Sequence, residues 1–257
     1  MRCREKCLRF LLEYGALTFG EFTLKNGRRS PYMVNTGELA AGAALSRLGC
    51  FYARTIYEEM EHGVIPESTN ILFGSAYKGI PLVAATAIAM MAAFGHDIGY
   101  CFNRKEEKSH GEGGIFVGKK PGAGDRVLIV DDTLTSGTAL RDTVDLLQLC
   151  APEAKVVGAI IAIDRKERGR DPRLTVVAET QYELGFPIFS IIDIDEIVTM
   201  LKSESYLTCK NTCDAKEPDC SYRAGVEGRA GRSLEEALPD KGQIAAVEEY
   251  LEFIRPK

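Results

Sequence analysis

The pattern of apolar and polar positions predicts alternating strands and helices through the middle of the chain. Short apolar runs predict strands at 71–73, 98–102, 127–130 and 156–163. Helical spacing of apolar residues predicts the intervening helices at 83–94 and 139–150. Such alternation is typical of a parallel sheet covered by helices on both faces, with ligands bound beyond the carboxyl ends of the strands. We therefore expect functional residues directly after Phe73, Phe102, Val130 and Ile163.

The flanking segments follow other patterns. Apolar residues at helical spacing predict helices over 3–14, 45–60 and 243–254. An alternating stretch at 19–24, a turn at Asn26-Gly27 and an extended run at 32–34 predict a hairpin. The polar segment at about 203–232 interrupts the alternation and is expected to be an accessory loop. We expect one domain over residues 1–257, closed by the C-terminal helix.

Composition excludes several classes of protein. The chain has 257 residues, 45% of them hydrophobic and 27% charged, which is typical of a globular protein. Its net charge of -5 disfavours general attraction to nucleic acid or to an anionic membrane. No apolar run approaches the roughly 20 residues that span a bilayer. We expect a soluble cytoplasmic protein with reduced thiols, in which Cys209, Cys213 and Cys220 lack the paired spacing of a zinc site.

The segment from Val130 to Thr138 carries the most specific chemistry. Two carboxylates follow the apolar run, and hydroxyl residues and Gly137 precede a helix. Backbone N–H groups at such a turn, together with the hydroxyl groups, would bind a phosphate. Asp131 and Asp132 would be repelled by that phosphate, so they suit ribose hydroxyls or a hydrated Mg²⁺ beside it. The alternative is an Asp-rich strand-to-helix turn with Thr caps.

This segment resembles the phosphoribosyl pyrophosphate signature of the type I phosphoribosyltransferases. Segments 22–32, 73–81 and 101–114 are similar to those of the orotate phosphoribosyltransferases, and the resemblance runs from about 17 to 169. It implies the type I phosphoribosyltransferase fold, an α/β fold with a mostly parallel central sheet flanked by helices. It also implies a small N-terminal hood over the base, at about residues 1–40.

The resemblance implies three sets of site residues. Those expected to bind the sugar diphosphate are Lys25, Tyr77, Lys78, Arg104, Lys105, Lys108, His110, Asp131, Asp132, Thr133, Leu134, Thr135, Ser136, Gly137, Thr138 and Ala139. Those expected to bind orotate are Lys25, Met33, Val34, Thr135 and Arg165. Those expected to be catalytic are Lys105, Lys108, His110 and Asp132. Met33 and Val34 depart from the family, which often has two aromatic residues at these positions.

Each of these segments also has a physical interpretation and a simpler alternative. The loop from Gly74 to Gly79 lets backbone approach a ligand beside Lys78, but it could be a surface turn with a solvated lysine. The cations of 104–110, followed by glycines, suit a mobile lid over a leaving pyrophosphate, but they could be a solvated face. The planar fork of Arg165 suits the carboxylate of orotate, but it could pair with Asp164.

The resemblance implies transfer of phosphoribose from 5-phospho-α-D-ribose 1-diphosphate to orotate, giving orotidine 5′-monophosphate and pyrophosphate in pyrimidine biosynthesis. Mg²⁺ is expected as cofactor, held mainly by the sugar diphosphate and water near Asp131 and Asp132 rather than by direct protein ligands. In the resembled family the lid reaches a neighbouring subunit, which implies a homodimer with shared active sites. The alternatives are a phosphoribosyltransferase that salvages purines or other bases, and a non-enzymatic regulator that binds the sugar diphosphate.

Overall fold

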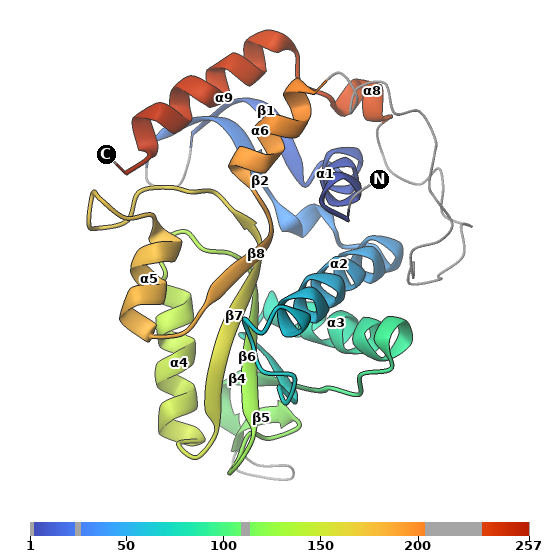
Figure 1. Cartoon of the computed structure of the whole chain (residues 1–257), viewed down its shortest axis with the longest axis vertical. Helices are drawn as coiled ribbons and strands as arrows, with labels where there is room; N and C mark the ends of the chain where they lie inside the picture. Colours follow the sequence, from blue (N-terminus) through green and yellow to red (C-terminus); the bar gives the residue numbers. More distant parts are fainter. Residues whose placement is uncertain (1–2, 24–26, 109–113, 204–232, 257) are drawn as a thin grey trace.

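The computed structural model describes residues 3–23, 27–108, 114–203 and 233–256, and these residues build a central six-stranded sheet in the order β5-β4-β3-β6-β7-β8 (Figure 1). The strands are β3 (Ile71–Gly74), β4 (Gly99–Lys108), β5 (Gly114–Gly118), β6 (Arg126–Thr133), β7 (Lys155–Asp164) and β8 (Ile188–Asp193). All neighbouring strands are parallel except β4 and β5. The expected α/β fold with a mostly parallel sheet is confirmed.

Helices cover both faces of this sheet. One face carries α2 (Gly42–Glu61) and α3 (Gly79–Phe94), and the other carries α4 (Thr138–Cys150) and α5 (Val176–Leu184) (Figure 1). Side chains alternate across β6, so Leu128 and Val130 enter the core on the α2–α3 side, whereas Val127 and Ile129 enter the core on the α4 side. This two-sided burial explains why β6 is a continuous apolar run in the sequence.

Helices α2 and α3 approach each other closely at Gly49. A Cβ atom at Gly49 would lie 2.7 Å from the carbonyl carbon and oxygen of Ala85. Only a residue without a side chain fits between the two backbones, so Gly49 sets the spacing of the helix pair. Because α3 begins directly after the loop that follows β3, this packing also fixes that loop.

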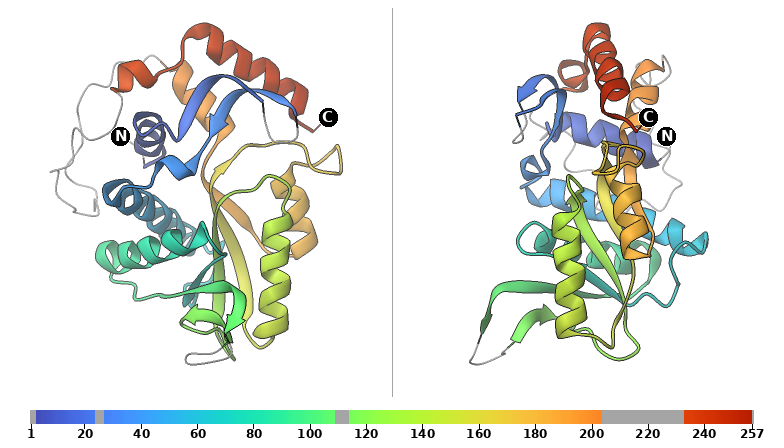
Figure 2. Two further views of the ribbon diagram at one scale, coloured as in Figure 1. Left: turned by 180° about the vertical axis from the view of Figure 1, so that it is seen from behind. Right: turned by 90° about the vertical axis from the view of Figure 1, so that its left-hand side faces the viewer.

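A second layer of structure lies over the carboxyl ends of the central strands (Figures 1 and 2). It consists of α1 (Cys3–Glu13), β1 (Leu17–Thr23), β2 (Arg29–Val34), α6 (Ile194–Lys202), α8 (Leu234–Ala237) and α9 (Lys241–Ile254). Strands β1 and β2 pair antiparallel with an irregularity between Phe19 and Phe22, which confirms the hairpin. Helix α9 packs on β2 and α8 packs on α1. The N-terminal segment expected to form the hood is thus completed by the C-terminal part of the chain.

The structure differs from the sequence expectation along β4 and in several elements that were not predicted. Strand β4 continues to Lys108 and pairs with β5, so the first residues of the expected lid are strand. Strand β5 and the run α5–β8–α6 had no predicted counterpart. Of the expected accessory loop only residue 203 lies within the described residues, so Cys209, Cys213 and Cys220 lie outside them.

The described helices include none that is both long enough and apolar enough to cross a membrane. The longest helix in this part of the chain, α2, contains charged residues along its length.

Candidate active site

Two acidic residues stand at the carboxyl end of β6, at the centre of the edge beneath the hood. The residue Asp132 is 7% exposed, and the Oδ2 atom of its carboxylate lies 2.6 Å from Nζ of Lys78. The hydroxyl of Thr36, from the 3₁₀ turn Thr36–Glu38 after β2, donates to the same oxygen over 2.7 Å. The backbone N–H of Thr133 donates to the other oxygen over 2.8 Å. The hood, the loop after β3 and the end of β6 therefore meet at one carboxylate.

Its neighbour Asp131 is in a different electrostatic environment. Burial, together with the negative charge of Asp132, raises the pKa of Asp131 to about 6. Burial also opposes ionisation of Asp132, but hydrogen bonds from Lys78 and Thr36 outweigh it and hold the pKa of Asp132 below its ordinary value. Tyr52 in α2 donates to the Asp131 carbonyl over 2.6 Å and fixes the backbone here. The pKa of Asp131 is therefore raised to about 6, and the pKa of Asp132 is lowered, so the two acids favour different protonation states.

The loop from Leu134 to Gly137 leads from these acids into α4. Leu134 is buried in the core beneath the loop, so its backbone rather than its side chain can face a ligand. Within the described residues, the N–H groups of Thr135, Ser136 and Gly137 donate to no acceptor. The side chains of Thr135, Ser136, Thr138 and Ala139 are exposed. Unused N–H donors at a helix N-terminus, beside exposed hydroxyls, form the kind of site that binds phosphate.

A second loop, Ser75–Lys78, follows β3 and faces the same edge. Its ends approach so closely that a Cβ atom at Gly74 would lie 2.3 Å from the Gly79 carbonyl oxygen. The N–H of Ala76 donates to the Asn103 side chain over 3.0 Å, and the peptide bond from Ala76 to Tyr77 is cis. Tyr77 and Lys78 are exposed, so the loop presents them to solvent. This is a compact loop that carries a cation beside the acid pair.

The described part of the expected lid lies along β4. The Lys105 ammonium stands 4.5 Å from the centre of the Tyr77 ring, a cation–π contact between the lid and the Ser75–Lys78 loop. Arg104 donates to the carbonyl of Gly114 over 3.0 Å, and so fastens β4 to β5. Lys108 ends β4, and the expected residues His110 and Lys25 lie outside the described residues.

Arg165 follows β7 at the same edge, within a ring of side chains from three elements. Its Nη2 atom lies 2.7 Å from Oε1 of the buried Glu167; both atoms are buried and out of line for a hydrogen bond, so their attraction is between charges. Its Nε donates to the Tyr32 hydroxyl over 3.4 Å, and its guanidinium lies 5.2 Å from the centre of the Tyr32 ring. Tyr32 meets Tyr250 of α9 edge to face, and Arg28 contacts both Tyr250 and Glu167.

The hood positions expected at the base differ from one another. Val34 is partly buried against the main core. Met33 points to the other side of β2 and lines an open hollow of about 380 Å³. The other lining residues include Glu13 at the end of α1, the following Tyr14, and Asn35 and Glu38 at the two ends of the 3₁₀ turn. The two residues therefore lie in different surroundings.

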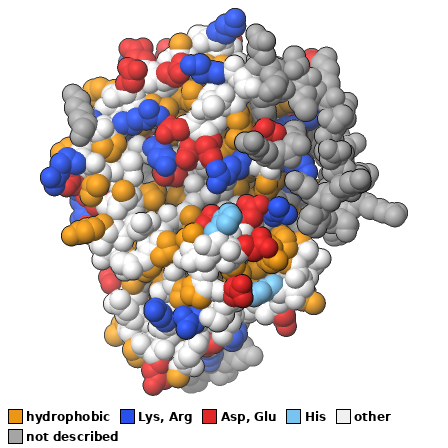
Figure 3. Space-filling model, in the orientation of Figure 1, with side chains coloured by type: hydrophobic (Ala, Val, Ile, Leu, Met, Phe, Trp, Pro, Cys, Tyr) orange, Lys and Arg blue, Asp and Glu red, His pale blue; other side chains and the backbone are white. Residues whose placement is uncertain are grey.

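A charged surface joins the hood to the sheet on the face seen in Figure 3, where acidic and basic side chains alternate over the middle of the molecule. Lys166 lies 3.5 Å from Asp164 and 3.4 Å from Asp193, the residue that caps α6. Arg4 of α1 pairs with Glu196 of α6. These ion pairs line a hollow of about 220 Å³ and fasten α1 and α6 to the end of β7, next to Arg165.

Five residues of this arrangement were not among the expected site residues: Thr36, Asn103, Arg28, Glu167 and Tyr250. Arg28 and Asn103 lie within segments that the sequence had singled out, and Glu167 lies two residues after Arg165, so a local signal was available for these three. Thr36 and Tyr250 reach the site through long-range contacts that leave no local pattern.

The fold and the loops at its edge define a class of protein. A parallel sheet whose central strand ends in two acids and a hydroxyl-rich turn, with a hood above, has the architecture of a phosphoribosyltransferase. Residues 36–187 match the phosphoribosyl transferase domain family, more than half of the chain. That match runs from the 3₁₀ turn to the residue before β8 and includes the acids, both loops and Arg165.

Particular relatives narrow the class. The orotate phosphoribosyltransferase of Bifidobacterium adolescentis is 47% identical over 188 residues, which are 73% of this chain and 81% of that protein. The enzyme of the same name from Pseudomonas fluorescens is 46% identical over 202 residues, 78% of this chain and 89% of that protein. The crystal structure of the orotate phosphoribosyltransferase of Francisella tularensis superposes with a TM-score of 0.71 at 29% identity, covering 96% of this chain and 98% of that one. The chain belongs to the orotate phosphoribosyltransferase family.

Proposed function

We propose that this protein transfers the phosphoribosyl group of 5-phospho-α-D-ribose 1-diphosphate to orotate in the cytoplasm, as a step of pyrimidine biosynthesis. The observation that carries the proposal is the placement of three anion-binding features at the edge of the sheet where Asp131 and the buried Asp132 stand. These features are the hydroxyl loop, the Lys78 loop and the Arg165 guanidinium, all at one edge of the sheet. The donor carries a phosphate at one end and a diphosphate at the other, and the base carries a carboxylate. These three anionic groups match the three anion-binding features.

The donor would lie across the end of β6. Its 5′-phosphate would take the N–H groups and hydroxyls of residues 135–138. Its ribose hydroxyls would donate to Asp131 and Asp132, because carboxylates attract hydroxyl donors and repel phosphates. Its diphosphate would then reach Tyr77 and Lys78. This placement of phosphate, ribose and diphosphate follows the arrangement of the protein, from the N-terminus of α4 through Asp131 and Asp132 to the Ser75–Lys78 loop.

Orotate would be placed by its carboxylate on Arg165. Glu167 and Tyr32 occupy the Nη2 and Nε positions of this guanidinium, which leaves Nη1 for a substrate oxygen. A charge-assisted hydrogen bond from a guanidinium to a carboxylate is among the strongest in proteins. Thr135 would contribute from the loop, and Met33, Val34 and Lys25 from the hood.

The transfer needs positioning and charge stabilisation rather than a covalent nucleophile. As the bond from C1 to the diphosphate breaks, positive charge grows on the sugar ring and negative charge on the departing pyrophosphate. Attack by the base from the opposite side inverts C1. Lys78, with Lys105, Lys108 and His110 of the lid, would stabilise the leaving group more in the transition state than in the ground state. Closing the lid would exclude water that hydrolyses the donor.

The donor atoms at the site fit Mg²⁺. Asp131 and Asp132 are hard oxygen ligands side by side, and Mg²⁺ is typically held by one or two carboxylates together with substrate phosphates. The described residues gather no cluster of three or more potential metal ligands, so most of its oxygens would come from the diphosphate and water. When bound, Mg²⁺ supplies charge neutralisation of the diphosphate.

We also propose a homodimer with shared active sites. Helix α3 exposes Ile88 (71%) and Met91 (54%), apolar side chains that a second copy would cover. The β4–β5 pair extends away from the body of the protein, as Figure 2 shows, and could reach a neighbour. Mixing a Lys105→Ala variant with an Asp132→Asn variant should restore some activity, because one active site of each mixed dimer is intact. No recovery in mixed dimers shown to form would contradict shared sites.

The direct test of the activity is the ultraviolet absorbance of orotate after addition of the donor. We expect rapid loss of the orotate signal with Mg²⁺, no loss with a chelator, and a severe loss of rate in Asp132→Asn. Binding of the donor without turnover of orotate would contradict the proposal.

A further inference from the structure

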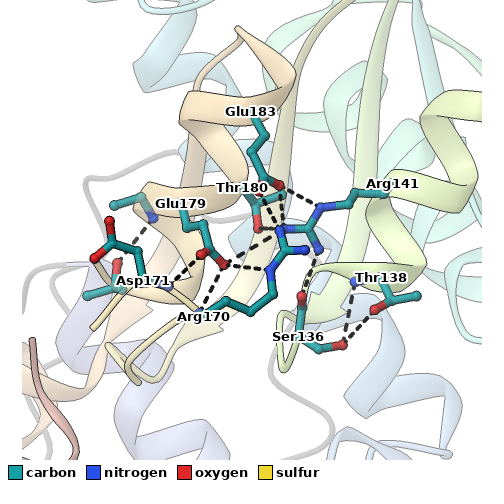
Figure 4. Close-up of polar contacts among 10 residues, drawn as sticks. Ser136, Thr138, Arg141, Arg170, Asp171, Glu179, Thr180 and Glu183 are labelled. Atoms are coloured by element: carbon teal, nitrogen blue, oxygen red, sulfur yellow. Dashed lines mark hydrogen bonds and ion pairs between the residues drawn. The ribbon is translucent and has the colours of Figure 1, made fainter. Parts of the chain in front are cut away.

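Arg141 of α4 lies behind the hydroxyl loop and contacts its backbone (Figure 4). Its Nη1 atom donates to the Ser136 carbonyl over 2.8 Å. Its Nη2 donates to the Thr180 hydroxyl over 3.3 Å, and its Nε donates to the Glu183 carboxylate over 2.7 Å. All three nitrogens of the guanidinium are therefore used in holding a loop residue and two residues of α5.

The contact with Ser136 fixes the direction of one peptide group. Figure 4 shows the Ser136 carbonyl pointing toward Arg141, while its hydroxyl points the other way and lies 3.0 Å from the Thr138 hydroxyl. A carbonyl oxygen turned into an anion site would repel the anion and would turn neighbouring N–H groups away from it. By accepting from Arg141, this oxygen is kept on the side opposite the exposed hydroxyls.

The loop rests directly on the residues behind it. Gly137 has φ of +74°, and a Cβ atom there would lie 2.4 Å from the Thr180 hydroxyl and 2.7 Å from Nη1 of Arg141. Both the backbone conformation and the lack of space require glycine. The loop cannot retreat from a ligand on its exposed side, because Arg141 and Thr180 fill the space behind it.

Arg141 is itself held rigidly. Glu183 pairs with both Arg141 and Arg170. The neighbouring Glu179, 7% exposed, accepts from the N–H groups of Arg170 and Asp171 over 3.2 and 2.8 Å. Glu183 thus balances the charge of Arg141. What Arg141 contributes to the loop is therefore the geometry of its planar guanidinium group.

We propose that Arg141 is a positioning residue for the 5′-phosphate of the donor: it fixes the Ser136 peptide so that the loop's N–H groups and hydroxyls face the phosphate. Arg141 does not touch the phosphate. This inference rests on the proposed function, because it takes a sugar phosphate as the ligand of the loop.

Two partial ligands separate the two phosphate subsites. Ribose 5-phosphate probes the hydroxyl loop, and pyrophosphate with Mg²⁺ probes the Ser75–Lys78 loop, so calorimetry on the full-length protein can measure each alone. Arg141→Lys keeps the charge but loses the fork, and should weaken ribose 5-phosphate binding about tenfold while pyrophosphate binding changes by less than about twofold. Arg173→Lys is the matched control, since Arg173 pairs with Asp171 on the surface, and should bind both ligands as the wild type does.

Thr180→Val removes one contact of the fork with little change of shape, and should shift ribose 5-phosphate binding in the same direction by a smaller factor. If Arg141→Lys fails to fold, Thr180→Val tests the inference by the same comparison of ribose 5-phosphate and pyrophosphate binding. The inference would be overturned if these variants bound ribose 5-phosphate as tightly as the wild type does, or if the binding of both ligands were weakened equally. It would also be overturned if the wild-type protein did not bind ribose 5-phosphate. If the wild-type protein bound ribose 5-phosphate but transferred phosphoribose only to a base other than orotate, the proposed function would be contradicted and this inference would not.

Discussion

The ammonium group of Lys78 lies 2.6 Å from the Oδ2 atom of Asp132, so the cation of one loop and the acid of the other neutralise each other. The Lys78 side chain is 66% exposed and the Asp132 side chain only 10%, so the lysine is the partner that can move. A diphosphate would compete with Asp132 for Lys78. Donor binding would then free Asp132 to accept ribose hydroxyls, which couples the two halves of the donor site.

Replacement of Lys78 by alanine should weaken pyrophosphate binding and raise the KM for the donor. The loss of a charge-assisted contact predicts an effect of about 10- to 100-fold. Lys119→Ala is the control, because Lys119 also pairs with an aspartate, Asp125, at the opposite end of the sheet. Steady-state kinetics measure both variants, and an unchanged donor KM in Lys78→Ala would remove Lys78 from the donor site.

Titration of Asp131 should appear in the pH dependence of activity. Burial and the adjacent Asp132 raise its pKa from 3.8 to about 6, and the ionised form is the better acceptor for ribose hydroxyls. We expect kcat/KM for the donor to rise with pH through about 6, and this limb to disappear in Asp131→Asn. A pH profile from 5 to 8 that keeps the limb in Asp131→Asn would assign it to another group.

Ionisation of Asp131 should raise activity but lower the stability of the folded protein. Because the folded protein favours the protonated Asp131, its contribution to stability is fully present below about pH 4 and is lost as the pH rises through about 6. Replacement by asparagine should therefore stabilise the protein near pH 8 relative to its effect at pH 4. Urea unfolding at the two pH values measures the difference.

Glu167 should determine how Arg165 is presented to orotate. Glu167→Gln keeps the shape of the side chain but removes the charge that holds Arg165 and Arg28. We expect the KM for orotate to rise about tenfold, with the donor KM within about twofold of wild type. Glu248→Gln, which breaks an exposed ion pair with Lys202, is the control. Equal changes in both KM values would point to a general structural role.

Packing at Gly49 should be sensitive to a single methyl group. Gly49→Ala places a Cβ atom 2.7 Å from the backbone of Ala85 and should lower the free energy of unfolding by about 1–3 kcal/mol. Gly42→Ala is the control in the same helix, because its Cβ atom meets nothing within 4 Å. Because alanine has a higher helix propensity than glycine, Gly42→Ala should leave the free energy of unfolding unchanged or raise it. Similar urea midpoints for the two variants would mean that α2 and α3 separate at little cost.

The central sheet was predictable because its strongest signals are local. The apolar run at 127–130 is buried on both faces, and the following helical pattern at 139–150 matches α4. Strand β5 was missed because it is short and begins at a glycine. The run α5–β8–α6 was missed because α6 begins directly at the end of β8, where Asp193 both ends the strand and caps the helix, with no loop to separate them.

The sequence indicated the candidate site where one segment carries the chemistry, as in Asp131 and Asp132. The site was not predictable where the contact depends on the fold. Thr36 reaches Asp132 across 96 positions of sequence, and Tyr250 of the C-terminal helix meets Tyr32 of the hood. Nothing in the local sequence of Thr36 or Tyr250 indicates these partners, because packing of the hood on the sheet creates them.

The most direct test of the central claim is a competition among bases. The protein is mixed with 5-phospho-α-D-ribose 1-diphosphate, Mg²⁺ and equal amounts of orotate, uracil, adenine, guanine and hypoxanthine, and the products are identified by chromatography and mass spectrometry. We expect orotidine 5′-monophosphate and pyrophosphate in equal amounts and no other nucleotide. A nucleotide of another base as the main product, or no nucleotide at all, would contradict the account.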